Sequence, residues 1–223
     1  MTIAVLACLS LLLMVAAFIY LTYKDFVGET IGSKITSAVK NNKKVLIYLC
    51  CALAFMIGLS VALFLIYKTN TLVANMKVIT LLGILVTVTV PDIKEHIIPN
   101  KVILVGVILR VCYAVAELIT LGSGYFEILK GDLFSLGLVA ILFLLGVLII
   151  KNGIGMGDIK LILVMGLFQG ITGVISSLFF SLLVSFFVAI AMLIMKKKSR
   201  KDAIAFAPSV LVGTAVSMFL TGM

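Results

Sequence analysis

The sequence predicts an all-α, polytopic integral membrane protein, a bundle of about eight transmembrane helices. Of its 223 residues, 63% are hydrophobic and only 12% are charged. The apolar residues form several continuous runs, and a run of about 18 or more residues is long enough to cross a bilayer as a helix. Because these runs do not alternate with polar residues, they favour helices over a transmembrane β-barrel.

The apolar runs predict the spans in chain order. The first run has no basic residue before it and no clear cleavage site after it, so we expect a retained helix and not a signal peptide. The third and sixth runs are short for a membrane crossing. Each adjoins a loop that contains an aspartate, so we expect helix and loop to lie at the same depth in the membrane. The expected spans are 3–23, 45–67, 76–91, 101–121, 132–150, 160–174, 176–195 and 203–222.

The basic residues predict the orientation in the membrane. The net charge of +9 could suggest nucleic acid, but most lysines lie in a few short loops, so no nucleic-acid partner is expected. The loops after the odd-numbered spans carry 14 Lys and Arg residues, and the opposite loops carry 3. Basic loops face the cytoplasm, which places both termini outside. The polar loop 24–44 is expected to lie on the anionic inner leaflet of the bilayer.

Neither a metal nor a cofactor is predicted. The single histidine, His96, cannot build a metal site alone, and no C-x-x-C pair is present. The four cysteines all lie in apolar runs, where we expect them to be small buried side chains: Cys8, Cys50, Cys51 and Cys112.

Ionisable residues at membrane depth are costly, so each is a candidate for function. The candidates are Asp92, Glu95, Arg110, Glu117 and Asp158. Arg110 and Glu117 are seven residues apart on one helix and share a face, which favours a structural ion pair or a contact with a neighbouring helix.

Asp92 and Asp158 are both predicted at the cytoplasmic ends of their helices. Two carboxylates that share one proton can hydrolyse a peptide, because one accepts a proton from water while the other donates to the scissile carbonyl. Close like charges cannot both ionise, so the titration belongs to the pair.

The residues around each aspartate suggest how the chain approaches it. The glycines before Asp158 allow positive φ and close backbone approach, either for an extended substrate or for a packed helix. They lie at 153, 155 and 157, and this stretch is the expected hinge. Pro99 interrupts the helix and favours an extended Ile98, so 92–99 is expected to form a short break before the fourth span.

Together these motifs resemble the type IV prepilin peptidases. The first motif is D-x5-I-P-N, from Asp92 to Asn100, and the second is G-x-G-D-x-K, from Gly155 to Lys160. The segment IAFAPSVLVGT at 204–214 is similar to the family's I-P-F-x-P-x-L-x-x-G stretch. The resemblance covers roughly residues 76–223.

The resemblance implies a transmembrane catalytic domain at 76–223, preceded at 1–75 by two helices and a basic cytoplasmic loop. It implies Asp92 and Asp158 as the catalytic pair of an aspartic endopeptidase in the cytoplasmic (inner) membrane. The implied partners are type IV prepilins or pseudopilins, whose short basic leader is removed at the cytoplasmic face. Motif residues with expected substrate or hinge roles are Gly155, Gly157, Lys160, Pro99, Asn100 and Pro208.

The sequence departs from the family pattern in two places. It lacks the paired C-x-x-C motifs associated with N-methylation, so a peptidase-only member is expected. In the C-terminal segment, Ala205 replaces the usual proline and Ala207 the usual glycine, while Pro208 remains.

Two other functions compete with this reading. Presenilin-type and signal-peptide-peptidase-type proteases also use G-x-G-D, but their first aspartate usually follows a tyrosine, whereas Pro91 precedes Asp92 here. A transporter with acids lining a cavity is the non-enzymatic alternative, although the inverted repeats common in transporters are not evident. The sequence predicts neither the oligomeric state nor the particular prepilin.

Overall fold

The computed structural model describes residues 2–24, 43–66, 71–149, 155–195 and 205–221. All regular structure in these ranges is helical, which confirms the predicted all-α class. Most of the expected basic loop 24–44, Gly153, and the basic segment after the seventh expected span lie outside the described residues.

The described helices follow the predicted order along the chain. Three of them, α4, α5 and α7, are long and apolar enough to cross a membrane. The elements are α1 (Thr2–Lys24), α3 (Lys43–Ile66), α4 (Leu72–Glu95), α5 (Asn100–Leu121), the short 3-10 helix η1 (Gly122–Gly124), α6 (Tyr125–Ile149), α7 (Met156–Ile194) and α8 (Ala207–Thr221).

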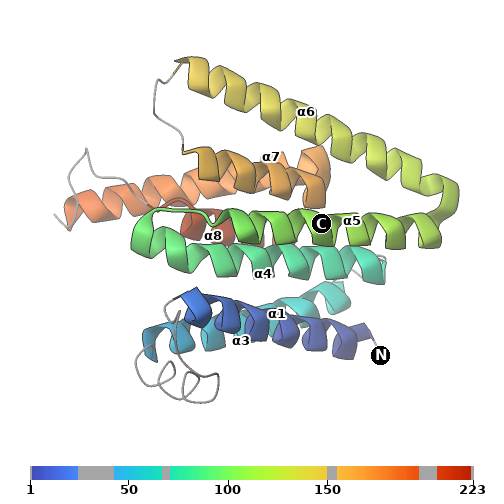
Figure 1. Cartoon of the computed structure of the whole chain (residues 1–223), viewed down its shortest axis with the longest axis horizontal. Helices are drawn as coiled ribbons and strands as arrows, with labels where there is room; N and C mark the ends of the chain where they lie inside the picture. The colour runs from blue at the N-terminus through green and yellow to red at the C-terminus, as the bar shows by residue number, and fades with distance from the viewer. Residues whose placement is uncertain (1, 25–42, 67–70, 150–154, 196–204, 222–223) are drawn as a thin grey trace.

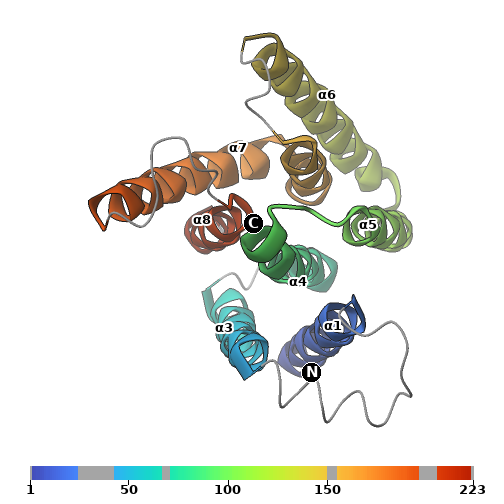
Figure 2. The ribbon, with the colours of Figure 1, turned by 60° about the vertical axis from the view of Figure 1, so that its left-hand side comes forward.

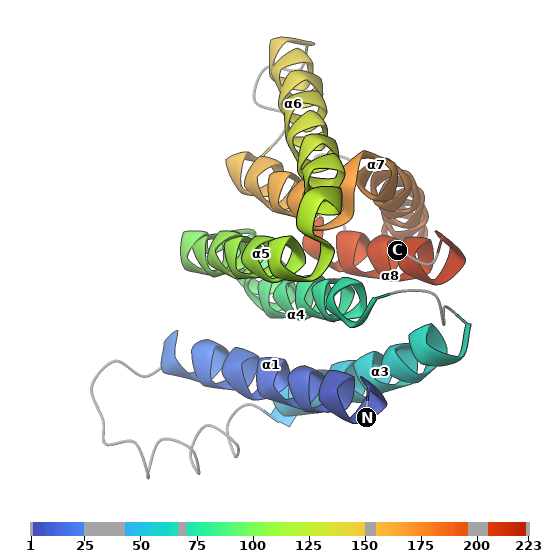
Figure 3. The ribbon, with the colours of Figure 1, turned by 90° about the vertical axis from the view of Figure 1, so that its right-hand side faces the viewer.

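Helix α4 lies at the centre of the bundle. Helices α1 and α3 pack together and cover one side of it, and α5 and α8 also pack against it (Figure 1). Helix α7 crosses α8 and packs against α6, which is farthest from the α1–α3 layer (Figure 3). Leu81, Leu85 and Val88 of α4 are fully buried, because helices surround it on several sides. The central helix therefore carries Asp92 towards one end of a packed core.

Helix α4 is longer than the sequence predicted. It has 24 residues and continues through Pro91 and Asp92 to Glu95, so the expected break at 92–99 starts only at His96. His96 ends the helix in the left-handed conformation and donates its N–H to the Asp92 carbonyl. A proline removes one helical hydrogen bond, and the extensive packing of α4 outweighs that cost. Asp92 is therefore held by a helix and not by a loop.

The sixth and seventh predicted spans together form α7, which is interrupted by a break. Gly170 has φ 66° and ψ −171°, which are not helical angles. The segments before and after this residue point in different directions (Figure 2). The predicted division near residue 175 is therefore real but lies five residues earlier, at a glycine that can adopt positive φ.

Helices α7 and α8 approach each other closely at Gly213. A Cβ atom at this position would collide with the backbone of Ser181. Small residues allow membrane helices to pack with their backbones near each other. This contact fixes α8 against the second segment of α7.

The outer surface of the bundle is apolar, as expected for a protein that faces lipid. Large side chains such as Ile119 and Phe134 are 79% and 66% exposed. The four cysteines are also exposed, so the expectation that they are buried was wrong. Apolar sequence cannot distinguish a core position from a lipid-facing one, because both environments favour the same side chains.

Candidate active site

The structure brings Asp92 and Asp158 to one cavity. This cavity has a volume of about 610 Å³ and lies where α4 ends and where α5, α7 and α8 begin. Both predicted aspartates line it, although they are far apart in sequence and stand on different helices. The lining residues are Asp92, His96, Ile97, Ile98, Asn100, Gly155, Met156, Gly157, Asp158, Lys160 and Phe206.

Asp92 is the more buried of the two acids. It lies in the last turn of α4, and only 5% of its surface is exposed. Its Oδ2 atom accepts a hydrogen bond from the backbone N–H of Ala207 at 2.7 Å. Ala207 is the first residue of α8, so the start of one helix holds the carboxylate at the end of another.

Asp158 lies in the first turn of α7 and is half-buried. Gly155 caps this helix in an extended conformation. A Cβ atom at Gly155 would lie 2.9 Å from Oδ2 of Asp158, so the absence of a side chain leaves room for the carboxylate. Because both carboxylates line one cavity, a negative charge on either of them makes ionisation of the other more costly.

The two glycines of the second motif act through close approach and not through unusual backbone angles. Among the described glycines, only Gly122 and Gly170 have positive φ, so Gly155 and Gly157 show the expected close approach without using the positive φ that glycine allows. A Cβ atom at Gly157 would lie 2.9 Å from Cβ of Ile98. Gly157 therefore lets the start of α7 contact the segment that follows Asp92.

Two further predicted residues bind each other at the cavity. Lys160 Nζ donates a hydrogen bond to Asn100 Oδ1 at 2.9 Å, which links the N-terminal ends of α7 and α5. Pro99 caps α5 with φ −68° and ψ 121°, which are extended angles, and Asn100 begins the helix. Pro208 lies in the first turn of α8 and does not line the cavity.

The sequence did not identify every group at the site. His96 lines the cavity, and its left-handed backbone follows from its position at the end of α4. The donor from Ala207 is a backbone N–H, so the residue type does not reveal it. Only the position of Ala207 in the C-terminal motif segment 204–214 pointed to a role at the site. Phe206 comes to the cavity from the same segment.

Arg110 and Glu117 lie in a separate buried network. Arg110 Nη1 contacts Glu117 Oε2 at 3.1 Å, and its Nη2 contacts Asp132 on α6. Lys77 Nζ lies 2.5 Å from Glu117 Oε1, and Arg110 Nε donates to the Leu167 carbonyl at 2.6 Å. These contacts join α4, α5, α6 and α7, so the predicted structural ion pair is confirmed.

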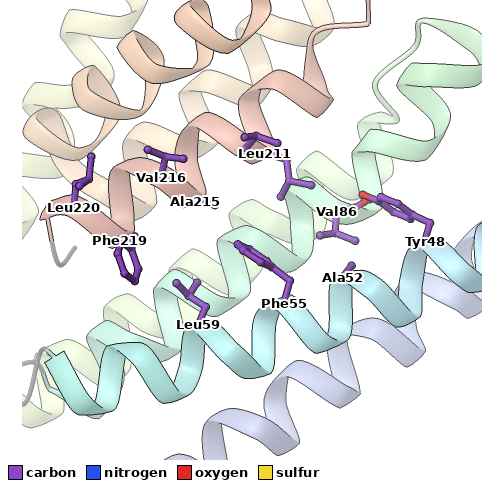
Figure 4. A pocket seen from close by; sticks show the side chains of 11 residues that line it. Tyr48, Ala52, Phe55, Leu59, Val86, Leu211, Ala215, Val216, Phe219 and Leu220 are labelled. Carbon is purple, nitrogen blue, oxygen red and sulfur yellow. The ribbon is translucent and has the colours of Figure 1, made fainter. Parts of the chain in front are cut away.

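A second hollow, of about 430 Å³, is almost wholly apolar. Figure 4 shows it between α3, α4 and α8, with Phe55 and Leu59 facing Phe219 across it. None of its lining residues is an acid or a base. It is therefore distinct from the polar cavity that contains the aspartates.

The fold and the site together define a class of protein. This is a helical membrane protein in which two carboxylates, held by different helices, line one polar cavity at an end of the bundle. A sequence model of the type IV leader peptidase family matches residues 79–194, and the chain belongs to this family. The matched segment includes both aspartates.

One relative has a stated activity. The chain is 26% identical over 140 residues to a protein of Bacillus subtilis (strain 168) named prepilin leader peptidase/N-methyltransferase. The match covers 62% of this chain and 53% of that relative, so it spans about half of the relative's length. No solved structure matches the chain.

Proposed function

We propose that this protein is an aspartic endopeptidase that removes the short basic leader from type IV prepilins or pseudopilins. The observation that carries the proposal is the meeting of Asp92 and Asp158 in one cavity. Membership in the type IV leader peptidase family supports the substrate class. Leader removal alone is proposed, without N-methylation.

The proposed reaction needs only the two carboxyl groups and water. In the working state the pair holds one proton, because neighbouring carboxylates cannot both ionise without a large electrostatic cost. The ionised member takes a proton from water as the water oxygen attacks the scissile carbonyl carbon. The protonated member donates to the carbonyl oxygen. Collapse of this intermediate breaks the C–N bond, and the amine leaves with a proton.

The proposed site faces the cytoplasm. The distribution of basic residues supports this orientation, since Lys94, Lys101 and Lys160 all lie near the end of the bundle that contains the cavity. The substrate's leader would approach from the cytoplasm, and its apolar helix would remain in the cytoplasmic (inner) membrane. Asn100 and Lys160 are proposed to shape the entrance to the site, and Pro99 to fix the start of α5.

The test is co-expression with candidate prepilins in membranes, with leader removal measured by mass. Asp92→Asn and Asp158→Asn are close in size to the native residues, and each should abolish cleavage. Lys101→Met is a matched surface control and should cleave normally. Cleavage by either aspartate variant would show that the pair is not catalytic.

A second arm of the experiment separates this function from the alternatives. Full-length prepilins and helical membrane stubs are offered to the same purified protein. We expect cleavage of the prepilin before its apolar helix and no cleavage within the stub. Cleavage inside the stub would favour a presenilin-type protease, and Asp158-dependent ion binding without proteolysis would favour a transporter.

A further inference from the structure

The two carboxylates receive different hydrogen bonds. Asp92 accepts the backbone N–H of Ala207 at 2.7 Å. Within the described residues, no donor makes a hydrogen bond to the carboxylate of Asp158. The pair is therefore asymmetric before any substrate binds.

The donor to Asp92 is a helix N-terminus. The Phe206 carbonyl accepts the first helical bond of α8, from the N–H of Val210 at 3.0 Å. The N–H groups of the first turn have no partner within their own helix, so Ala207 is free to bind the carboxylate. Ala207 is fully buried and Asp92 is 5% exposed, so little water competes for this bond. A hydrogen bond from N–H to a carboxylate favours the ionised form.

Among the described residues, neither His96 nor Lys160, which line the cavity, makes a hydrogen bond to either carboxylate. Asp158 lies in the first turn of α7, and that helix dipole also favours ionisation, but by less than a direct bond does. The ammonium group of Lys160 donates a hydrogen bond to the side chain of Asn100. His96, from the segment after α4, lines the same cavity as both acids. Ala207 is thus the observed donor that distinguishes the two carboxylates.

We propose that Asp92 is the ionised member of the pair and Asp158 the protonated member, with the Ala207 N–H as the positioning group that sets this order. The inference rests on the proposed peptidase function. Asp92 takes a proton from water while Asp158 protonates the scissile carbonyl oxygen. When the C–N bond breaks, Asp92 passes its proton to the leaving nitrogen. The proton released as the carbonyl re-forms returns to Asp158.

The main test replaces the donor without removing the helix. Ala207→Pro eliminates the N–H, and proline is well tolerated at the first position of a helix. Ala207→Gly retains the N–H and is the matched control. Without the bond, Asp92 ionises only at higher pH, so the acid limb of the kcat/KM profile should move up by about one pH unit. The basic limb, which reports loss of the second proton, should stay in place. A profile of Ala207→Pro that overlays wild type would overturn the proposal.

A second measurement uses the unaltered protein, so it does not depend on whether the proline variant folds. Carbodiimide modifies protonated carboxyl groups, and mass spectrometry reports the modification of each aspartate as the pH is raised. Modification of Asp92 should be half lost at a lower pH than that of Asp158. The reverse order, or a common midpoint, would overturn the proposal. This titration needs no substrate, so absence of prepilin cleavage would refute the peptidase function without deciding the order.

Discussion

Lys160 and Asn100 form a side-chain bridge between two helix starts at the cavity. We predict that Lys160→Met lowers kcat/KM for prepilin cleavage by about tenfold, which corresponds to loss of one hydrogen bond to a charged group. The measurement is leader removal by purified protein. Lys101 is exposed and also near the start of α5, so Lys101→Met is the matched control and should retain full activity. Equal losses in both variants would indicate a general effect of positive charge.

Arg110 is the centre of the buried charge network. We predict that Arg110→Met lowers the free energy of unfolding by about 3 kcal/mol, because Glu117 and Asp132 would lose a partner while still buried. Thermal unfolding in detergent measures the effect. Lys130→Met removes an exposed pair with Glu127 and should cost less than about 1 kcal/mol. Similar losses would show that the network adds no stability beyond a surface pair.

At the scale of elements, the contact between α7 and the segment after α4 depends on Gly157. We predict that Gly157→Val lowers prepilin cleavage by about 100-fold, because its Cβ atom would press on Ile98 and displace one aspartate from the other. The amount of folded protein in the membrane should change much less. Gly137→Val is the control, since no atom lies near that position. Equal losses of activity and folded protein would indicate only a packing role.

The helices themselves were largely predictable from the apolar runs, but their ends were not. The expected span 132–150 begins at Tyr125 in the structure, because the charged residues of the first turns are accommodated by pairing. Asp132 contacts Arg110, and Lys130 contacts Glu127. Hydropathy assigns charged residues to loops, so it cannot locate a helix end that depends on such tertiary contacts.

At the scale of the whole molecule, the orientation can be tested by labelling. In a variant with the native cysteines replaced, we predict that a cysteine at Lys101 reacts with an impermeant reagent only from the cytoplasmic side. A cysteine at Lys130 should react only from the opposite side, because the topology predicted from the basic residues puts these positions on different faces. Labelling of both from one side would contradict the predicted topology.

The sequence predicted that the two aspartates belong to one site, but not how they are held. Asp92 and Asp158 could be paired from their motifs and from the lysine distribution. The bond from Ala207 to Asp92 could not, because a backbone donor leaves no mark in residue type and the two positions are brought together only by packing of α8 against α4. Gly157 was identified, but its contact with Ile98 required the three-dimensional structure.

The break at Gly170 joins two parts of α7 that have different tasks. The first part carries Asp158, and the second packs against α8, whose first residue binds Asp92. A single backbone joint, twelve residues from Asp158, thus lies between the segment that carries one aspartate and the segment that packs against the helix holding the other. We expect a ligand that locks this joint at another angle to stop the proposed prepilin cleavage without entering the cavity.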